Sequence, residues 1–194
     1  MTSIALRGGL EVAKPLELTL EFLDAYPNQE SREPARPWSF AEGDLRHANR
    51  GGARISATQI AAILERREAI ESALHEIEPT ASLTARSIPW AALTRLFDGF
   101  ADIPGIGFSK TTKALHPKRP ALIPMLDSVV QAYLLSPSGG SFGDQATALV
   151  RSYKEDLDRN RAVLREVKRE LARRGHELSE VRILDLLIWS LGSV

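Results

Sequence analysis

The chain has 194 residues, 43% of them hydrophobic, and its 25 Lys and Arg balance 25 Asp and Glu, so the formal net charge at pH 7 is zero. This length suits one domain, or one domain with a short arm. The neutral balance excludes a general attraction to nucleic acid, so any such affinity has to come from a local patch. The chain has no cysteine, which excludes disulfides, zinc–thiolate sites and iron–sulfur clusters and indicates a reducing, cytoplasmic setting.

Three further features narrow the class of protein. No apolar run approaches the ~18 residues that cross a bilayer, so we expect no membrane span. The first ten residues hold one Arg and lack the hydrophobic region of a secretory signal, so we expect none there. The four histidines show no paired ligand spacing, and we expect neither a metal site nor a cofactor.

The first 50 residues are typical of an N-terminal arm or an irregular lobe. Residues 16–26 alternate apolar and polar side chains until Leu23 breaks the pattern, so a short helix and a strand both remain open. Residues 42–49 indicate a short helix that Gly51 and Gly52 end. We therefore treat 1–50 as one unit and 51–194 as a helical domain.

From Ser56 onward the pattern is helical. Ser56 and Gln59 have the spacing of a capping box, and apolar residues at 3–4 spacing continue to Pro79. Further helices are predicted over 89–100, from the glycine-rich segment to about 115, and over 129–135, 144–174 and 179–191, with Trp90 and Trp189 in the core. With six or seven helices and no convincing sheet, the sequence predicts an all-α fold, an orthogonal multi-helix bundle with an irregular N-terminal arm.

The segment 103–127, IPGIGFSKTTKALHPKRPALIPMLD, carries the chemistry. A helix, then Pro-Gly-Ile-Gly, then a helix is the pattern of a helix-hairpin-helix at about 90–115. The glycines permit a tight turn and leave backbone amides uncovered, so that a phosphate can approach a helix N-terminus. Between Pro104 and Leu126 there is no acid, and four cations follow the turn: Lys110, Lys113, Lys118 and Arg119. This local basic patch predicts contact with a nucleic-acid backbone.

These residues resemble the helix-hairpin-helix DNA glycosylase superfamily, in which a catalytic Asp follows the second hairpin glycine by twenty residues. Gly107 plus twenty is Asp127, within Leu-Asp-Ser-Val. The wider KALHPKRPALIPMLDSVV context, with the late LDLLIW, also resembles a bacterial family known only as a domain of unknown function. The superfamily resemblance covers about 25 residues.

The resemblance implies specific roles. Gly105 and Gly107 would bind a DNA phosphate, and Asp127 would stabilise the sugar cation, or orient the attacking water, as a flipped base leaves. The Schiff-base Lys of bifunctional members is replaced by Ser109, so the implied enzyme is a monofunctional glycosylase that uses water. In the superfamily a His usually follows the catalytic Asp, and that position is occupied by Val129 in this chain. The expected partner is duplex DNA, contacted by Gly105, Gly107, Ser109, Lys110, Lys113, Lys118 and Arg119.

Each motif also has a simpler interpretation. Asp127 precedes an apolar helix, where Asp is a common N-cap. The glycine turn is also compatible with a plain connection between helices, and Lys118 and Arg119 with a solvated loop between two prolines. The leading hypothesis is a helical DNA-binding protein with a glycosylase-type hairpin, and the alternative is a non-enzymatic interaction module. An open cleft beside Asp127 would favour the enzyme, and a carboxylate occupied by its own helix amides would favour the module.

Overall fold

The computed structural model describes residues 3–26, 36–134 and 139–192. Over these ranges the regular secondary structure is helical apart from one small two-stranded sheet, which confirms the all-α prediction. The elements are β1 (Ile4–Ala5), β2 (Glu11–Val12), α1 (Pro15–Ala25), α2 (Glu42–Arg50), α3 (Ala57–Leu64), α4 (Arg67–His75), α5 (Trp90–Asp98), α6 (Phe108–Leu115), α7 (Ser128–Tyr133), α8 (Phe142–Arg159), α9 (Arg161–Arg173) and α10 (Glu180–Gly192), with short 3-10 turns at Arg7–Gly9 and His116–Lys118.

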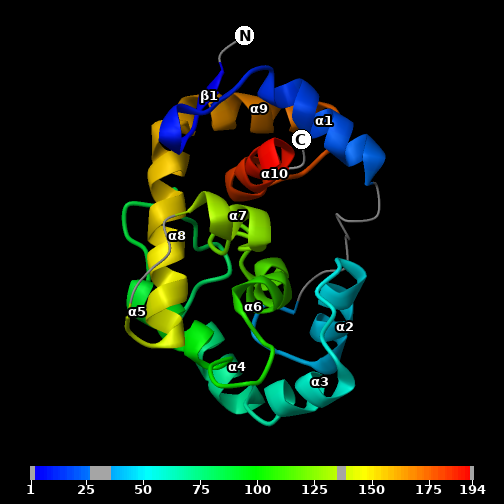
Figure 1. Ribbon diagram of the computed structural model, residues 1–194, viewed down its shortest axis with the longest axis vertical. Coiled ribbons are helices and arrows are strands. Elements are labelled where there is room, and N and C mark those ends of the chain that lie inside the picture. The colour runs from blue at the N-terminus through cyan, green and yellow to red at the C-terminus, as the bar shows by residue number, and fades with distance from the viewer. Residues whose placement is uncertain (1–2, 27–35, 135–138, 193–194) are drawn as a thin grey trace.

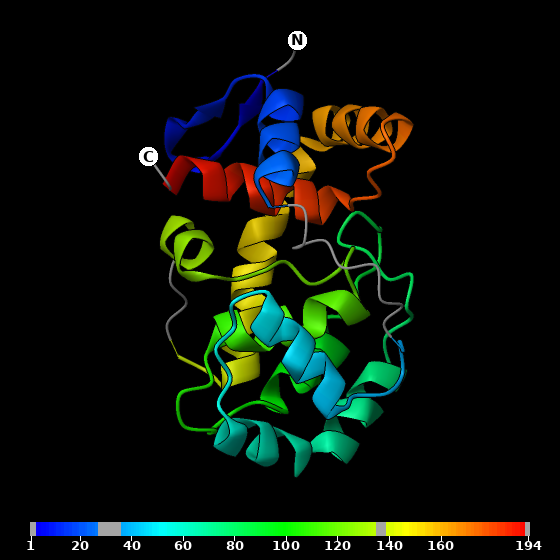
Figure 2. The same ribbon diagram turned by 90° about the vertical axis from the view of Figure 1, so that its right-hand side faces the viewer.

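The helices form two groups that α8 connects (Figures 1 and 2). One group holds α1, α9 and α10, and the other holds α2 to α6. In the first group α10 packs against α1 and α9, and it also contacts α7; in the second group α5 packs against α4 and against the connecting helix α8. Every side chain from Val181 to Ile188 on α10 is buried, so this helix lies at the centre of its group.

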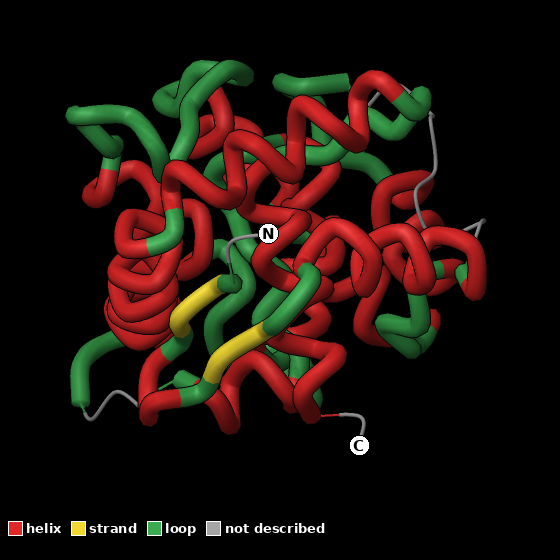
Figure 3. The backbone as a smooth tube through the Cα atoms, turned by 90° about the horizontal axis from the view of Figure 1, so that it is seen from above, coloured by secondary structure: helices red, strands yellow, loops and turns green. Residues whose placement is uncertain are grey.

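The N-terminal segment joins the same core. Its two-residue strands pair antiparallel, with Ile4 opposite Val12, and form the small ribbon seen in Figure 3. Ile4, Val12 and Leu23 are buried, as is Leu45 on α2. For residues 16–26 the sequence pattern was compatible with either a helix or a strand, and the structure shows a helix, α1. The division of the chain at residue 50 stays a prediction.

The predicted long helix over 144–174 is wrong, because Asn160 divides it into α8 and α9. Asn160 has φ −102° and ψ 11°, outside the helical range. Its side chain accepts from Ala5 N at 2.9 Å and donates to Ala5 O at 2.8 Å, so the break pairs with the edge of β1. This turn lets α9 fold back over α1 and α10. The helical segment predicted from Ser56 until Pro79 is also divided, at Glu65 and Arg66, into α3 and α4.

The start of α8 lies directly against α5. Gly143 N donates to Asp98 Oδ1 at 2.6 Å, and Ser141 Oγ donates to the other oxygen of the same carboxylate at 3.2 Å. A Cβ at Gly143 would stand inside the van der Waals contact distance of the Thr94 carbonyl oxygen. Glycine is therefore required here by the close approach of two helices. No described helix is both long and apolar enough to span a membrane.

Candidate functional site: a cleft beside Asp127

The glycine turn lies between α5 and α6 and leans on the start of α3. Gly105 has φ +74°, a conformation that glycine adopts at little cost. Gln59 Nε2 donates to Pro104 O at 2.9 Å, and a Cβ on Gly105 would lie 2.6 Å from that same nitrogen. Gly107 is exposed, has open space beside it and caps the N-terminus of α6.

The helices on either side of the turn do not form the expected pair. Helix α6 packs chiefly against α2, whereas α5 packs against α8 and α4. The structure therefore shows two helices joined by the glycine turn, but these helices do not pack on each other as a helix-hairpin-helix pair. Phosphate binding by Gly105 and Gly107 stays a prediction.

Two of the predicted cations remain at the surface of this region. Lys110 Nζ donates to Gln59 Oε1 at 2.8 Å, and Lys113 Nζ donates to Gly51 O at 3.1 Å. Partial burial lowers the pKa of Lys113, and the charge of Asp127 opposes that shift. Ser109 is half-buried in the first turn of α6. Phosphate contacts of Ser109, Lys110 and Lys113 also stay predictions.

Lys118 and Arg119 lie inside the protein, which corrects their assignment to the phosphate-binding patch. Lys118 is 3% exposed and pairs with Asp44 at 2.6 Å. Arg119 is fully buried, and its guanidinium donates to four backbone carbonyls, those of Pro37, Leu74, Ile77 and Lys118. Burying a cation costs free energy unless it is hydrogen-bonded. The contacts of Arg119 therefore have a structural role, because they connect residues 36–37 to α4, and they leave its guanidinium unavailable to a ligand.

Asp127 begins α7 and caps it. Its Oδ1 accepts from Val129 N at 3.0 Å and from Val130 N at 2.9 Å, as the N-cap interpretation predicts. Within the described ranges the structure shows no hydrogen bond to the other oxygen, Oδ2. The same residue also lines a cleft of about 390 Å³. The cleft beside Asp127 favours the enzyme, and the engagement of its carboxylate by helix amides favours the non-enzymatic module. The structure therefore meets each of the two criteria in part.

The cleft is built from α1, α2, α6, α10 and the start of α7. Its charged, titratable and aromatic lining comprises Phe22, Tyr26, Trp189, His47, Arg50, Lys113, Arg182, Asp127 and Asp185. Among the predicted site residues the cleft joins only Asp127 and Lys113, and it leaves out the glycine turn, Ser109 and Lys110.

Aromatic rings form one wall of this cleft. Phe22 and Trp189 meet edge to face with ring centroids 5.5 Å apart, and Tyr26 meets Trp189 in the same manner at 6.0 Å. Tyr26 is 41% exposed. Trp189, predicted as a core residue, is only half-buried and lines the cleft instead. Phe22 and Tyr26 also contact each other, with ring centroids 4.8 Å apart, so the three rings form one aromatic cluster of which Tyr26 is the exposed member.

The contribution of α10 to the cleft was not predicted from the sequence. Arg182, Asp185 and Trp189 follow the i, i+3, i+7 spacing of one helix face within an otherwise apolar segment. A charged residue among buried apolar residues is rare unless it has a partner or a role, and that was the available signal. Burial raises the pKa of the Asp185 carboxyl to about 7, against the opposing charge of Arg182.

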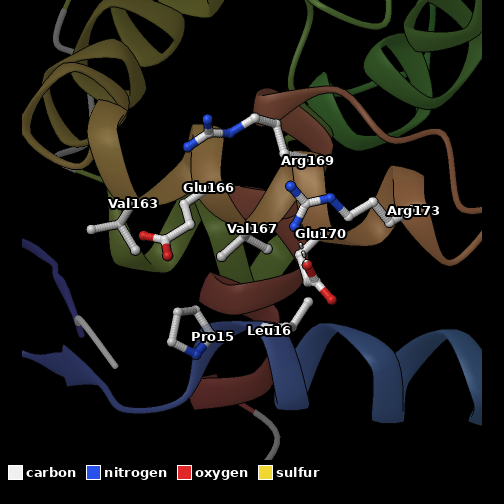
Figure 4. Close-up of a pocket in the computed structure, with 8 residues that line it drawn as sticks. All are labelled: Pro15, Leu16, Val163, Glu166, Val167, Arg169, Glu170 and Arg173. Carbon is white, nitrogen blue, oxygen red and sulfur yellow. Dashed lines mark hydrogen bonds and ion pairs between the residues drawn. The ribbon is translucent and has the colours of Figure 1, made fainter.

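A second groove lies between α1 and α9 (Figure 4). Its floor is formed by Leu16, Val163 and Val167, and charged side chains of α9 border it. Glu170 pairs with Arg173 at 3.0 Å and with Arg174 at 3.3 Å, at the i, i+3 and i, i+4 spacings that favour ion pairs within a helix. Because this acid is paired within its own helix, the groove offers less for ligand recognition than the cleft beside Asp127.

The comparisons with known proteins give a family but no function. A family model described as "Family of unknown function (DUF6308)" matches residues 21–192. No curated protein matches the chain, and no solved structure matches it. None of these comparisons links the chain to DNA glycosylases. Because the match spans most of the sequence, the chain belongs to this family of unknown function, DUF6308.

Proposed function

We propose that the protein binds nucleic acid and that the cleft beside Asp127 accepts a nucleotide turned out of the stack, with Asp127 as the catalytic carboxylate of a base-excision reaction. One observation carries this proposal. The Asp at the position implied by the glycosylase resemblance lines a cleft whose walls also hold aromatic rings and three cations.

The lining suits the parts of a nucleotide. Tyr26 and Trp189 line the cleft, and the exposed part of the Tyr26 ring would contact the base. Arg50, Lys113 and Arg182 offer positive charge for phosphates. Lys110, outside the cleft on the first turns of α6, extends this charge toward the glycine turn. A bound nucleotide would thus have its base, sugar and phosphate opposite different walls.

The proposed reaction is hydrolytic. A base in a duplex has to leave the stack before its bond to the sugar is accessible. As that bond breaks, the electron pair goes to the base and positive charge develops on the sugar, which a carboxylate at Asp127 stabilises. Water supplies the nucleophile, because the position of the Schiff-base Lys is Ser109. Its oxygen forms the new bond to the sugar, and the proton that it loses neutralises the base that has left. The two amides of α7 hold the Asp127 carboxylate in place before the ligand arrives.

Binding is tested first, in a salt series with duplex, single-stranded and abasic DNA. If Lys110 and Lys113 contact phosphates, Lys110→Gln and Lys113→Gln should each flatten the log–log salt dependence by about 0.9. Lys168→Gln is the matched control, because this lysine is exposed on α9, away from the cleft. Slopes that are equal in all three variants and the wild type would remove both lysines from the interface.

Chemistry is tested by Asp127→Asn. Asn is as good an N-cap as Asp, so the variant should keep α7 and DNA binding while base release is lost. The readout is release of base from duplex substrates carrying a panel of damaged or mismatched bases. Equal release by the wild type and the variant would refute the catalytic role.

The second candidate is a non-enzymatic nucleic-acid-binding module. The engagement of Asp127 Oδ1 by two helix amides favours it, because that contact alone explains an acid at this position. In this case DNA binding would depend on salt and on Lys110 and Lys113, and the wild type would release no base from any substrate.

A further inference from the structure

The loop between α2 and α3 carries an arginine that has no partner in the fold. Arg54 is exposed, and its side chain has neither an ion pair nor a hydrogen bond among the residues that the structure describes. Its φ is +56°, a left-handed conformation that residues other than glycine rarely adopt. Because glycine would fit this backbone at a lower cost, an arginine at this position requires an explanation.

The loop holds the backbone of Arg54 in this conformation. Asn49, near the end of α2, accepts through Oδ1 from Ile55 N at 2.6 Å and donates through Nδ2 to Ile55 O at 2.9 Å. On the other side, Ala53 N donates to Ala48 O at 3.0 Å. These contacts fix the chain before and after Arg54, so the arginine is held at this end of α2 before any ligand arrives.

The same loop contacts Lys113, which brings a second cation to this edge of the cleft. Lys113 Nζ donates to Gly51 O at 3.1 Å, and a Cβ on Gly52 would lie 3.8 Å from that nitrogen. Gly51 and Lys113 both line the cleft. Burial lowers the pKa of Lys113; the charge of Asp127 opposes that shift, and the like charge of Arg54 adds to it. The two cations are therefore near enough to repel each other.

We propose that Arg54 and Lys113 together bind one backbone phosphate of the nucleic acid, next to the nucleotide that the cleft holds. This inference rests on the proposed function and adds to it a phosphate-binding residue from the α2–α3 loop. An anion between the two side chains replaces their repulsion with two charge-assisted interactions. The planar guanidinium and the compact ammonium are both well suited to phosphate oxygens.

The position of Arg54 beside the cleft fits a phosphate of the continuing strand. The cleft has a volume of about 390 Å³, near the lower end of the range for small-molecule sites, so one nucleotide fills it and its neighbours stay outside. Lys113 lines the cleft, whereas Arg54 is exposed and does not line it. A phosphate bound by both residues therefore lies where the strand leaves the cleft.

The test compares two probes that differ only in backbone charge. One is a five-residue oligothymidylate with ordinary phosphodiesters, and the other has the same bases joined by uncharged methylphosphonates. Inorganic phosphate and thymidine monophosphate represent phosphate from other sources. Each is titrated into the full chain as the wild type, Arg54→Gln, Arg54→Gly and Arg46→Gln. Arg46 is the matched control, because it is an exposed arginine on α2 that pairs with Glu42 and does not line the cleft.

We expect Arg54→Gln to bind the oligothymidylate about five- to tenfold more weakly than the wild type, because one charge-assisted contact is lost. Its log–log salt dependence should be flatter by about 0.7. With the methylphosphonate probe the two proteins should bind equally, and Arg46→Gln should match the wild type with both probes. The oligothymidylate, but not the methylphosphonate, should also raise the pKa of Lys113, which is followed by NMR of its labelled side chain and assigned with Lys113→Gln.

Arg54→Gly separates binding from folding. Glycine adopts the left-handed backbone readily, so the melting temperature should be unchanged or rise by up to about 4 °C, while the affinity falls as it does in Arg54→Gln. A melting temperature that falls by more than about 4 °C would give Arg54 a structural role and would count against the proposal.

Three results would overturn this inference and leave the proposed function in place. Oligothymidylate binding with equal affinity and salt slope in the wild type and Arg54→Gln would remove Arg54 from the interface. An equal effect of Arg54→Gln on both probes would show that Arg54 does not contact a phosphate. Inorganic phosphate or thymidine monophosphate that raised the pKa of Lys113 as much as the oligothymidylate does would assign the site to free phosphate.

The duplex DNA of the salt series separates this inference from the proposed function. If the duplex binds and the short probes do not, its salt slope decides, because Arg54→Gln should flatten that slope by about 0.9 and an unchanged slope would refute the role of Arg54. If the wild type binds neither the duplex nor any single-stranded probe, the proposed function and this inference both fail.

Discussion

The ionisation of Asp185 should make the stability of the fold depend on pH in a defined range. Burial raises the pKa of this carboxyl from 3.8 to about 7. Between these two values the folded chain keeps a proton that the unfolded chain has released, so stability falls as pH rises, by about 1.4 kcal/mol per pH unit. The fall ends above about pH 7, where both states have released the proton. From pH 5 to pH 8 the accumulated loss is about 2–3 kcal/mol.

Urea unfolding followed by far-UV circular dichroism at pH 5, 6, 7 and 8 measures this loss. Asp185→Asn has the same shape and cannot ionise, so the wild type should lose about 2–3 kcal/mol of unfolding free energy relative to this variant from pH 5 to pH 8. Other titrating groups are common to both proteins and cancel in the difference. Asp24→Asn, at an exposed site on α1, is the matched control and should show a constant difference. A constant difference for Asp185→Asn as well would show that Asp185 is already ionised at pH 5 and would refute the argument.

Three further predictions concern the framework, and each is measured by urea or thermal unfolding. Gly143→Ala places a methyl group against a backbone carbonyl of α5 and should cost about 2–3 kcal/mol, whereas the control Gly43→Ala, in open space on α2, should be neutral or stabilise by up to about 1 kcal/mol. Arg119→Met leaves several buried carbonyls without donors and should cost about 3 kcal/mol or more, with no change in the salt slope of DNA binding. Asn160→Ala removes both hydrogen bonds to the first strand and should cost about 1–3 kcal/mol. An unfolding free energy equal to that of the wild type would contradict each of the three destabilising predictions.

Local signals predicted the helices, and long-range contacts decided where they break. The capping box of Ser56 and Gln59 is confirmed, with Gln59 N donating to Ser56 Oγ at 3.3 Å. The break at Asn160 had no local signal, because Asn is only mildly unfavourable in a helix and its partner, Ala5, lies at the other end of the chain. Periodicity reports which face of a segment is apolar, but it does not report a hydrogen bond to a distant strand.

The basic patch shows the same limit for side chains. Lys110 and Arg119 look alike in sequence, since both follow the glycine turn in a segment without acids. Their environments differ because α4 and residues 36–37 cover Arg119 and leave Lys110 at the surface. Counting charges along a segment therefore overestimated the cations available to a phosphate. The position of Asp127 at a helix start was predicted correctly, but the walls of the cleft that it lines come from α1, α2 and α10, which no local motif connects.

Helix α10 links the cleft to the core. Its buried apolar residues hold α1, α7 and α9 together, while Arg182, Asp185 and Trp189 on one face line the cleft. Because Met125 N donates to Asp185, the same helix also positions the segment that ends at Asp127. The two acids are thus fixed relative to each other by the central helix of the fold, as a site on rigid elements requires. A ligand in the cleft would contact α10 in the folded protein alone, so binding there should also raise the free energy of unfolding of the protein.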